Sequence, residues 1–440
     1  MTPAARLQAS IELLDSILSS LREQGSSADV LIQQYFRSRR YAGSKDRAAV
    51  REIVYDVIRK LGRYNRQLST LSVTPKQDEE SRLMAAMYLN DAGHPVEQFF
   101  VGDKFAPAPL SNREQDMLRE VAKAGDTPES FISEDYVPGW MLPALQQRFE
   151  ANLQQEVMAL NGRAPLDLRI NGLKSCVSNS QQYIENKEIN SSFVTYTDFG
   201  LRLPAGTSIK GWGLYQDGSL EIQDAAAQIA VKCCGLQSGQ NVIDLCAGAG
   251  GKSLAAASYM SNKGKITACD INAARLDAAK PRIKRAGASI IRLKTLSEYA
   301  THRQNTLREQ QGTADRVILD VPCTGTGVWR RNPESKWRLA APQLKGYQKL
   351  QYQLLREGAG LVKEGGRLIY MTCSLLPQEN EDQIKAFLQD NPGFKLVPYS
   401  YSFGGSSPKT ASLIPECLQL TPFQHNTDGF FVAIMQKDTL

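Results

Sequence analysis

The second half of the chain alternates short apolar runs with helical patterns, and this alternation limits its fold more than any other feature. The apolar runs after Gly235 lie at 241–245, 265–270, 289–293, 316–319 and 367–371. Strands separated by helices form a mostly parallel sheet that is covered on both faces. We therefore predict an α/β domain with such a sheet over residues 236–440.

The first part of the chain has a different texture. Leu7, Ile11, Leu14, Leu18 and Leu21 recur at helical spacing, and the pattern returns over 46–68 and 81–89. We predict an all-α domain over 1–139, which ends in a linker around Gly125, Pro128, Pro138 and Gly139. Over 140–235, a helix at 142–149 precedes β-type runs at 166–170, 192–196 and 220–222, which indicates a small α+β connecting domain.

The composition of the 440 residues is that of a soluble globular protein, with a net charge of +6. Residues 29–66 hold 10 basic and 4 acidic side chains, which is either a nucleic-acid patch or a solvated helix face. Eight cysteines without a CxxC pair, and only three histidines, argue against structural zinc and against a disulfide scaffold. The sequence shows neither a signal peptide nor a membrane span. We expect a cytoplasmic protein that binds no metal and no membrane.

A glycine-rich loop follows the first strand of the predicted sheet, between Asp244 and an Ala-rich helix. Glycines at such a turn let a ligand approach the backbone N–H groups of the helix N-terminus. Gly251-Lys252-Ser253 would close a phosphate-binding P-loop, but the glycine that it requires five positions earlier is Cys246. The second strand ends in Asp270, which either accepts ribose hydroxyl groups or caps the next helix. Together, the loop and Asp270 favour a nucleoside-containing ligand.

Two cysteines follow two other strands of the predicted sheet. Asp320-Val321-Pro322-Cys323 comes directly after a buried run, and Cys373 ends the last run in Thr372-Cys373-Ser374. A single cysteine is usually a packing residue. Two thiols and an acid at the carboxyl ends of neighbouring parallel strands, where such sheets build their sites, favour catalysis instead.

These motifs together resemble the RNA cytosine-5 methyltransferases of the NOL/NOP/Sun family. The similarity extends to Gln223-Asp224, Arg330-Arg331-Asn332-Pro333 with Lys336-Trp337, Glu379-Asn380-Glu381, Asp428-Gly429-Phe430-Phe431 and Leu168-Arg169-Ile170-Asn171. The N-terminal helices, with Ser44-Lys45-Asp46-Arg47, look like the NusB-related RNA-binding domain of the bacterial small-subunit rRNA members. The resemblance thus implies a Rossmann-like class I methyltransferase domain that uses S-adenosylmethionine to form 5-methylcytosine in RNA, most simply in 16S ribosomal RNA. A monomer is expected.

The resemblance also implies roles for individual residues. Carbon 5 of cytosine becomes nucleophilic only after a thiolate adds to carbon 6, and an acid at nitrogen 3 stabilises that adduct. Cys373 would be the nucleophile, Cys323 would assist release, and Asp320 would be the acid; the opposite assignment of the two thiols stays open. The residues assigned to the cofactor are Cys246, Ala247, Gly248, Ala249, Gly250, Gly251, Lys252, Asp270 and Asp320. Arg330, Arg331 and Lys336 are expected to grip the RNA backbone, unless they are merely solvated.

Two departures from the family pattern keep alternatives open. The usual Ala-Pro-Gly-Gly loop reads Gly248-Ala249-Gly250-Gly251, and the third strand lacks an acid near the adenine, because it reads Arg292-Leu293-Lys294-Thr295-Leu296. The alternatives are a transfer RNA methyltransferase, a non-catalytic RNA-binding ribosome assembly factor and, from the near P-loop, a phosphotransferase.

Overall fold

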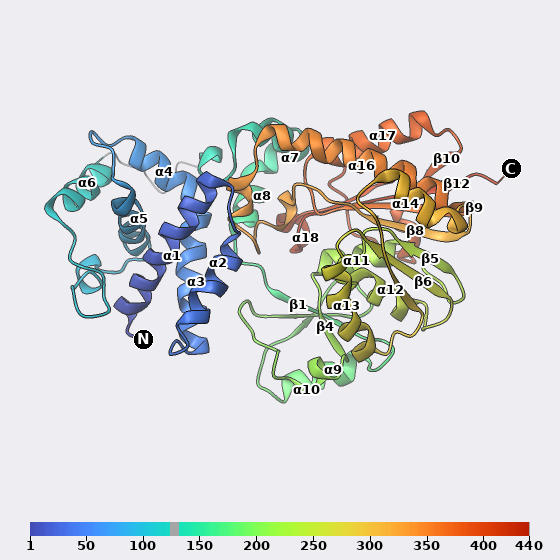
Figure 1. Cartoon of the computed structure of the whole chain (residues 1–440), viewed down its shortest axis with the longest axis horizontal. Helices are drawn as coiled ribbons and strands as arrows, with labels where there is room; N and C mark the ends of the chain where they lie inside the picture. The colour runs from blue at the N-terminus through green and yellow to red at the C-terminus, as the bar shows by residue number, and fades with distance from the viewer. Residues whose placement is uncertain (124–131, 440) are drawn as a thin grey trace. The chain divides into compact units, whose positions relative to one another are not determined.

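The computed structural model describes residues 1–123 and 132–439, which form two compact units (Figure 1). One unit contains Met1–Pro143 and Arg331–Leu339, and the other contains Ala144–Arg330 and Ala340–Leu440. Gly125 and Pro128 of the predicted linker lie outside the described residues. The three predicted domain ranges, 1–139, 140–235 and 236–440, stay a prediction.

The first unit is helical, as predicted. Its main helices are α1 (Pro3–Glu23), α2 (Ala28–Ser38), α3 (Ser44–Arg59), α4 (Leu61–Ser69), α5 (Gln77–Asp91) and α6 (Asn112–Lys123). Thr2 caps α1 by accepting the Ala5 N–H, and Leu7 and Leu14 of the predicted stripe are fully buried. The single helix expected over 46–68 is wrong: it breaks at Lys60, which has φ −95° and ψ 7°. A Cβ atom at Gly62 would lie 2.6 Å from the carbonyl oxygen of Asp135. Glycine therefore lets the backbone of α4 approach the backbone at Asp135 closely.

A short segment from the second half of the sequence completes the helical unit. Within Arg331–Leu339 lies α15 (Ser335–Arg338). The indole of Trp337 donates to the Ile58 carbonyl at 2.9 Å, and Glu334 accepts the Ala28 N–H at the start of α2 at 3.1 Å. Sequence reasoning placed these residues in the α/β domain, whereas the structure packs them with the helices.

The second unit begins with α7 (Leu142–Phe149) and α8 (Leu153–Asn161), followed by a small antiparallel sheet in the order β2-β3-β1-β4. Its strands are β1 (Leu166–Ile170), β2 (Ser192–Phe193), β3 (Gly200–Leu203) and β4 (Leu220–Ile222), and α9 (Val177–Glu185) packs against them. The sequence predicts β1 and β4 with these bounds but makes β2 too long. It misses β3, where Gly200 leaves too short an apolar run for the pattern.

The main sheet has the order β10-β12-β9-β8-β5-β6-β7. Its strands are β5 (Asn241–Asp244), β6 (Lys265–Asp270), β7 (Ile291–Thr295), β8 (Ala314–Asp320), β9 (Val362–Thr372), β10 (Phe394–Val397), β11 (Leu418–Leu420) and β12 (Phe430–Lys437). The five strands from β5 to β9 pair in parallel, and β12 pairs antiparallel with β9, β10 and β11. The predicted mostly parallel α/β sheet is confirmed.

Helices cover both faces of this sheet (Figure 1). One face packs on α11 (Ala225–Cys233), α12 (Gly251–Tyr259) and α13 (Ala273–Ala286), and the other on α14 (Ala300–Leu307), α16 (Ala341–Leu361) and α17 (Glu381–Asp390). Along β8, Ile318 enters the first core, while Val317 and Leu319 enter the second. Burial on both faces explains why the strands read as continuous apolar runs. The parallel pairing brings the carboxyl ends of β5, β6, β8 and β9 to one edge of the sheet.

Two further properties concern only the described part of the chain. None of its helices has both the length and the apolarity that a membrane crossing requires. Nor do its His, Cys, Asp and Glu side chains form a group of three that could hold a metal ion.

Candidate active site

A cleft of about 690 Å³ opens at the carboxyl edge of the parallel strands. Its walls are the loops that follow β5, β6, β8 and β9, which carry residues 246–252, Asp270, Asp320, Cys323 and Cys373. The structure therefore brings together the loop, the acids and the thiols that the sequence singles out, although they are spread over more than a hundred positions.

The glycine-rich loop makes a tight turn between β5 and α12. Gly248 and Gly250 have φ values of 54° and 78°, in the left-handed region that glycine adopts without strain. Gly250 precedes the first residue of α12, so the N-terminal N–H groups of that helix lie at the loop. The geometry gives a ligand close access to the backbone.

Asp270 closes the loop from the next strand. Its two carboxylate oxygens accept the backbone N–H groups of Gly248 and Asn272, each at 2.8 Å. Each oxygen keeps a lone pair for a hydroxyl donor. Ile271 and Leu296 line the cleft beside it. The sequence did not point to these two apolar residues, because the side chain expected near the adenine after the third strand was an acid.

The two thiols lie side by side. Cys323, after β8, and Cys373, after β9, have their sulfur atoms 3.4 Å apart. The hydrogen bond with Cys373, together with burial, raises the pKa of Cys323 well above its usual value.

Glu379 connects the loop after β8 with the loop after β9, which carry the two thiols. This fully buried carboxylate accepts the Thr324 N–H at 2.9 Å and the hydroxyl groups of Thr324 and Ser374, each at 2.5 Å. Gln351 on α16 donates to Glu379 at 2.9 Å and to the Pro322 carbonyl at 3.0 Å. One acid thus fixes the residues that follow each cysteine, a role that its position in the sequence does not reveal.

Asp320 is paired with the lysine of the glycine-rich loop. Lys252 Nζ donates to Asp320 Oδ2 at 2.5 Å. Burial alone would lower the pKa of Lys252, but the charge of Asp320 and the hydrogen bond to it outweigh burial and raise this pKa. This ion pair lines the same cleft as the glycine-rich loop and the two thiols.

Two of the three predicted RNA contacts are engaged within the protein. The guanidinium of Arg330 is buried and bonded to Asp428 at 3.0 Å. The ammonium of Lys336 is fully buried and donates to the carbonyls of Arg59 and Tyr136 in the helical unit. Burial lowers the pKa of Lys336 well below its usual value. Both cations therefore lie inside the protein, Arg331 is half-buried, and an RNA contact by any of the three stays a prediction.

Comparison with known proteins identifies the family. Residues 232–436 match the family described as 16S rRNA methyltransferase RsmB/F, and residues 137–210 match its RsmF/B-like, ferredoxin-like domain. A probable ribosomal RNA small subunit methyltransferase B of Synechocystis is 30% identical over 338 residues, which are 74% of each chain. The chain belongs to this family. The predicted resemblance is confirmed.

Two further matches cover nearly the whole length of this family member. A ribosomal RNA small subunit methyltransferase B of Shewanella oneidensis is 28% identical over 438 residues, covering 95% of this chain and 96% of the relative. The crystal structure of PH0851 superposes with a TM-score of 0.78 at 25% identity, covering 99% of each chain. Both matches include the helical unit as well as the α/β unit.

Proposed function

We propose that the protein transfers a methyl group from S-adenosylmethionine to carbon 5 of a cytosine in 16S ribosomal RNA. The observation that carries the proposal is the pair of thiols, with sulfur atoms 3.4 Å apart, in one cleft with Asp320 and the glycine-rich loop. We expect the protein to act on RNA as a monomer in the cytoplasm.

The cleft fits the cofactor by the chemistry of its lining. Residues 246–252 offer backbone groups, the Asp270 oxygens can accept ribose hydroxyl groups, and Ile271 and Leu296 offer apolar surface to a purine ring. When bound, S-adenosylmethionine supplies an electrophilic methyl group. The P-loop alternative is not favoured, because Asp320 engages the Lys252 ammonium that would bind phosphate.

The thiols supply what cytosine lacks. The Cys373 thiolate would add to carbon 6, forming a carbon–sulfur bond and moving electron density onto carbon 5 and nitrogen 3. Asp320 in its protonated form would donate a hydrogen bond from one carboxyl oxygen to nitrogen 3 and stabilise that charge, with Lys252 donating to the other oxygen. The assignment of Cys373 as the nucleophile follows the family resemblance, and the thiolate is the form that attacks.

Release reverses the addition. Once carbon 5 carries the methyl group, water takes the proton from carbon 5 and the bond between sulfur and carbon 6 breaks with its electron pair on sulfur, which restores the aromatic ring and the Cys373 thiolate. Cys323 lies 3.4 Å from Cys373 and would assist this elimination. Without Cys323, the covalent complex is expected to persist.

The test is methyl transfer from labelled S-adenosylmethionine to unmodified 16S rRNA and transfer RNA transcripts, with wild type, Cys373→Ala and Cys323→Ala. We expect labelled 5-methylcytosine in 16S rRNA with wild type, none with Cys373→Ala, and an adduct stable to denaturing electrophoresis with Cys323→Ala. An adduct with Cys373→Ala instead would exchange the two roles. Methylation of transfer RNA alone would favour that alternative, and no transfer by folded wild type would favour the assembly factor.

A further inference from the structure

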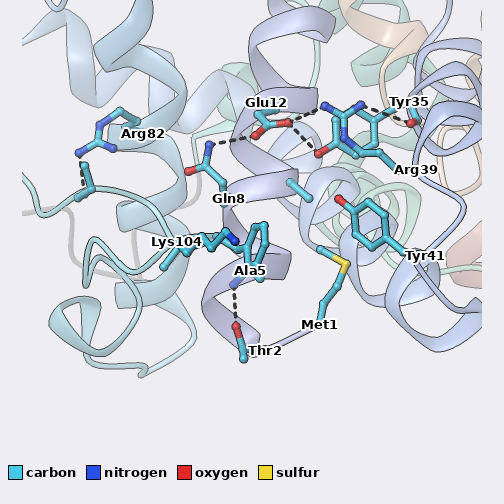
Figure 2. Close-up of a pocket in the computed structure, with 14 residues that line it drawn as sticks. Met1, Thr2, Ala5, Gln8, Glu12, Tyr35, Arg39, Tyr41, Arg82 and Lys104 are labelled. Carbon is cyan, nitrogen blue, oxygen red and sulfur yellow. Dashed lines mark hydrogen bonds and ion pairs between the residues drawn. The ribbon is translucent and has the colours of Figure 1, made fainter.

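The helical unit carries a cleft of about 1060 Å³ that the proposed chemistry does not use (Figure 2). Its floor is α1, with Ala5, Gln8 and Glu12. One wall includes Lys104 and Phe105, from the stretch between α5 and α6, and the other includes Arg39 and Tyr41, from the turn after α2. The cleft is larger than the one at the thiols.

Two aromatic rings of this cleft stand in solvent. Tyr41 is 74% exposed and Phe105 is 67% exposed, and they belong to opposite walls. A ring packed into a core covers its apolar faces, but most of the surface of these two rings stays in solvent, at a cost in hydrophobic free energy. Exposed rings beside cations are the surface on which single-stranded nucleic acids stack their bases.

The one acid named on the floor of the cleft is neutralised by its neighbours. Glu12, on the floor, is already satisfied: it accepts hydrogen bonds from Gln8 at 3.1 Å, Tyr35 at 2.8 Å and Arg39 at 3.2 Å (Figure 2). The guanidinium of Arg39 also stacks on the Tyr35 ring at 3.7 Å. The carboxylate is thereby screened by its own partners.

Other cations near the cleft keep their charge free. Within the described residues, Arg40, Lys45 and Lys104 form no ion pair, and all three side chains are exposed. Arg40 directly precedes Tyr41 in the sequence and Lys45 follows four residues after it, although neither is among the residues that line the cleft. Lys104 does line it, and its Nζ lies 5.4 Å from the centre of the Phe105 ring. Each exposed ring thus has at least one unpaired cation beside it in the sequence.

From these observations we propose that the cleft over α1 binds a single-stranded RNA segment, stacking bases on Tyr41 and Phe105 and holding phosphates with Arg40, Lys45 and Lys104. This inference rests on the proposed function, which makes RNA the substrate, and assigns part of the recognition to a site outside the catalytic cleft. An RNA strand would use both features of this surface, the exposed rings for stacking and the unpaired cations for phosphate contacts.

The test is the affinity of the full-length protein for a short, unstructured, fluorescent RNA oligonucleotide, with the same sequence as a duplex for comparison. The variants are Tyr41→Ala, Phe105→Ala and their double mutant. Tyr41→Phe keeps a stacking ring, and Tyr401→Ala is the matched control, because Tyr401 is also 74% exposed but belongs to the other unit. Arg40→Gln with Lys45→Gln tests the charges, and melting temperatures check that each variant is folded.

We expect each alanine to weaken single-strand binding about fivefold or more, since stacking on one ring is worth that much. Tyr41→Phe and Tyr401→Ala should bind like wild type, and the double glutamine variant should show a shallower dependence of affinity on salt. Methyl transfer by the Tyr401→Ala control should equal that of wild type, which checks the catalytic cleft independently.

Two results would overturn the inference while leaving the proposed function intact. One is full single-strand affinity in the double alanine variant with normal methyl transfer, which would leave the cleft to a protein ligand. The other is an equal loss of duplex and single-strand binding, which would exclude stacking. A wild-type protein that neither binds nor methylates RNA would instead overturn the proposed function.

Discussion

The carboxyl group of Asp244, at the end of β5, is buried with only one of its oxygens bonded. Oδ2 accepts the Ser253 hydroxyl at 2.6 Å, while Oδ1 has no partner among the described residues. Burial, with the nearby charge of Asp320, raises the pKa of Asp244 to about 6 from 3.8. The folded state therefore binds this proton more tightly than the unfolded chain does.

This shift predicts a pH-dependent stability. The stabilisation from the proton on Asp244 is complete below pH 3.8 and is lost as the pH rises through about 6. Between pH 5 and pH 7.5, the free energy of unfolding of wild type should fall by about 1 kcal/mol relative to Asp244→Asn, which cannot ionise. Urea denaturation of both proteins at the two pH values measures this difference, and parallel pH profiles would contradict the assignment.

Asp270 gives a second test at a single residue. Asp270→Ala removes the acceptor of the Gly248 and Asn272 N–H groups, and with it the proposed ribose contact. We expect the affinity for S-adenosylmethionine to fall at least about tenfold, as hydrogen bonds to a charged acceptor are lost. Isothermal titration calorimetry measures this affinity, with Asp277→Ala as the control, because Asp277 pairs with Lys280 on the surface of α13. Unchanged affinity for S-adenosylmethionine would mean that the cofactor does not contact Asp270 at the end of β6.

At the scale of elements, Glu379 ties the loops after β8 and β9 to the 3-10 turn Pro377–Glu379 and to α16. Glu379→Ala leaves a buried N–H and two buried hydroxyl groups without their acceptor, so the free energy of unfolding should fall by roughly 3 kcal/mol or more. The two thiols would also lose their common support. We therefore expect formation of the covalent RNA adduct, measured in the Cys323→Ala background, to fall more than stability alone explains.

Glu381, two residues further on, is the matched control for this prediction. Its side chain is equally buried, but its own partners are Arg148 at 2.6 Å, Ser412 and Leu413, and it reaches the loop after Cys373 indirectly, through Arg148, which donates to the Leu375 carbonyl at 2.5 Å. Glu381→Gln should lower the melting temperature and leave adduct formation by the folded fraction intact. If both variants lose adduct in proportion to stability, Glu379 does not position the thiols.

Elements also show what the sequence can and cannot predict. The strands from β5 to β9 were predictable because burial on both faces leaves continuous apolar runs, and the loop, Asp270, Asp320 and the thiols follow from their places at the strand ends. Lys336 was not, because a lysine in a polar segment normally lies in solvent, and only tertiary structure supplies the carbonyls that hold it. Glu379 and Leu296 likewise acquire their roles through residues distant in the sequence.

At the scale of the whole molecule, the two units are not consecutive pieces of sequence. The chain leaves the α/β unit at Arg330, contributes Arg331–Leu339 to the helical unit, and returns at Ala340. Trp337 packs partly buried against the helical core, and Arg338 donates to the carbonyls of Gly25 and Ser26 at 3.1 Å and 2.6 Å. A fragment cut at Pro143 therefore lacks part of its own core.

This arrangement predicts that residues 1–143 alone are less stable than the same residues joined to 331–339 by a flexible linker. Loss of the Trp337 packing and of the hydrogen bonds to Ile58 and Ala28 should cost roughly 3 kcal/mol or more, a fall of about 10 °C in melting temperature. Thermal unfolding followed by circular dichroism measures both fragments, and Trp337→Ala in the linked fragment should remove most of the gain. Equal melting temperatures would mean that the helices fold without the segment, and that residues 331–339 do not stabilise the helical unit.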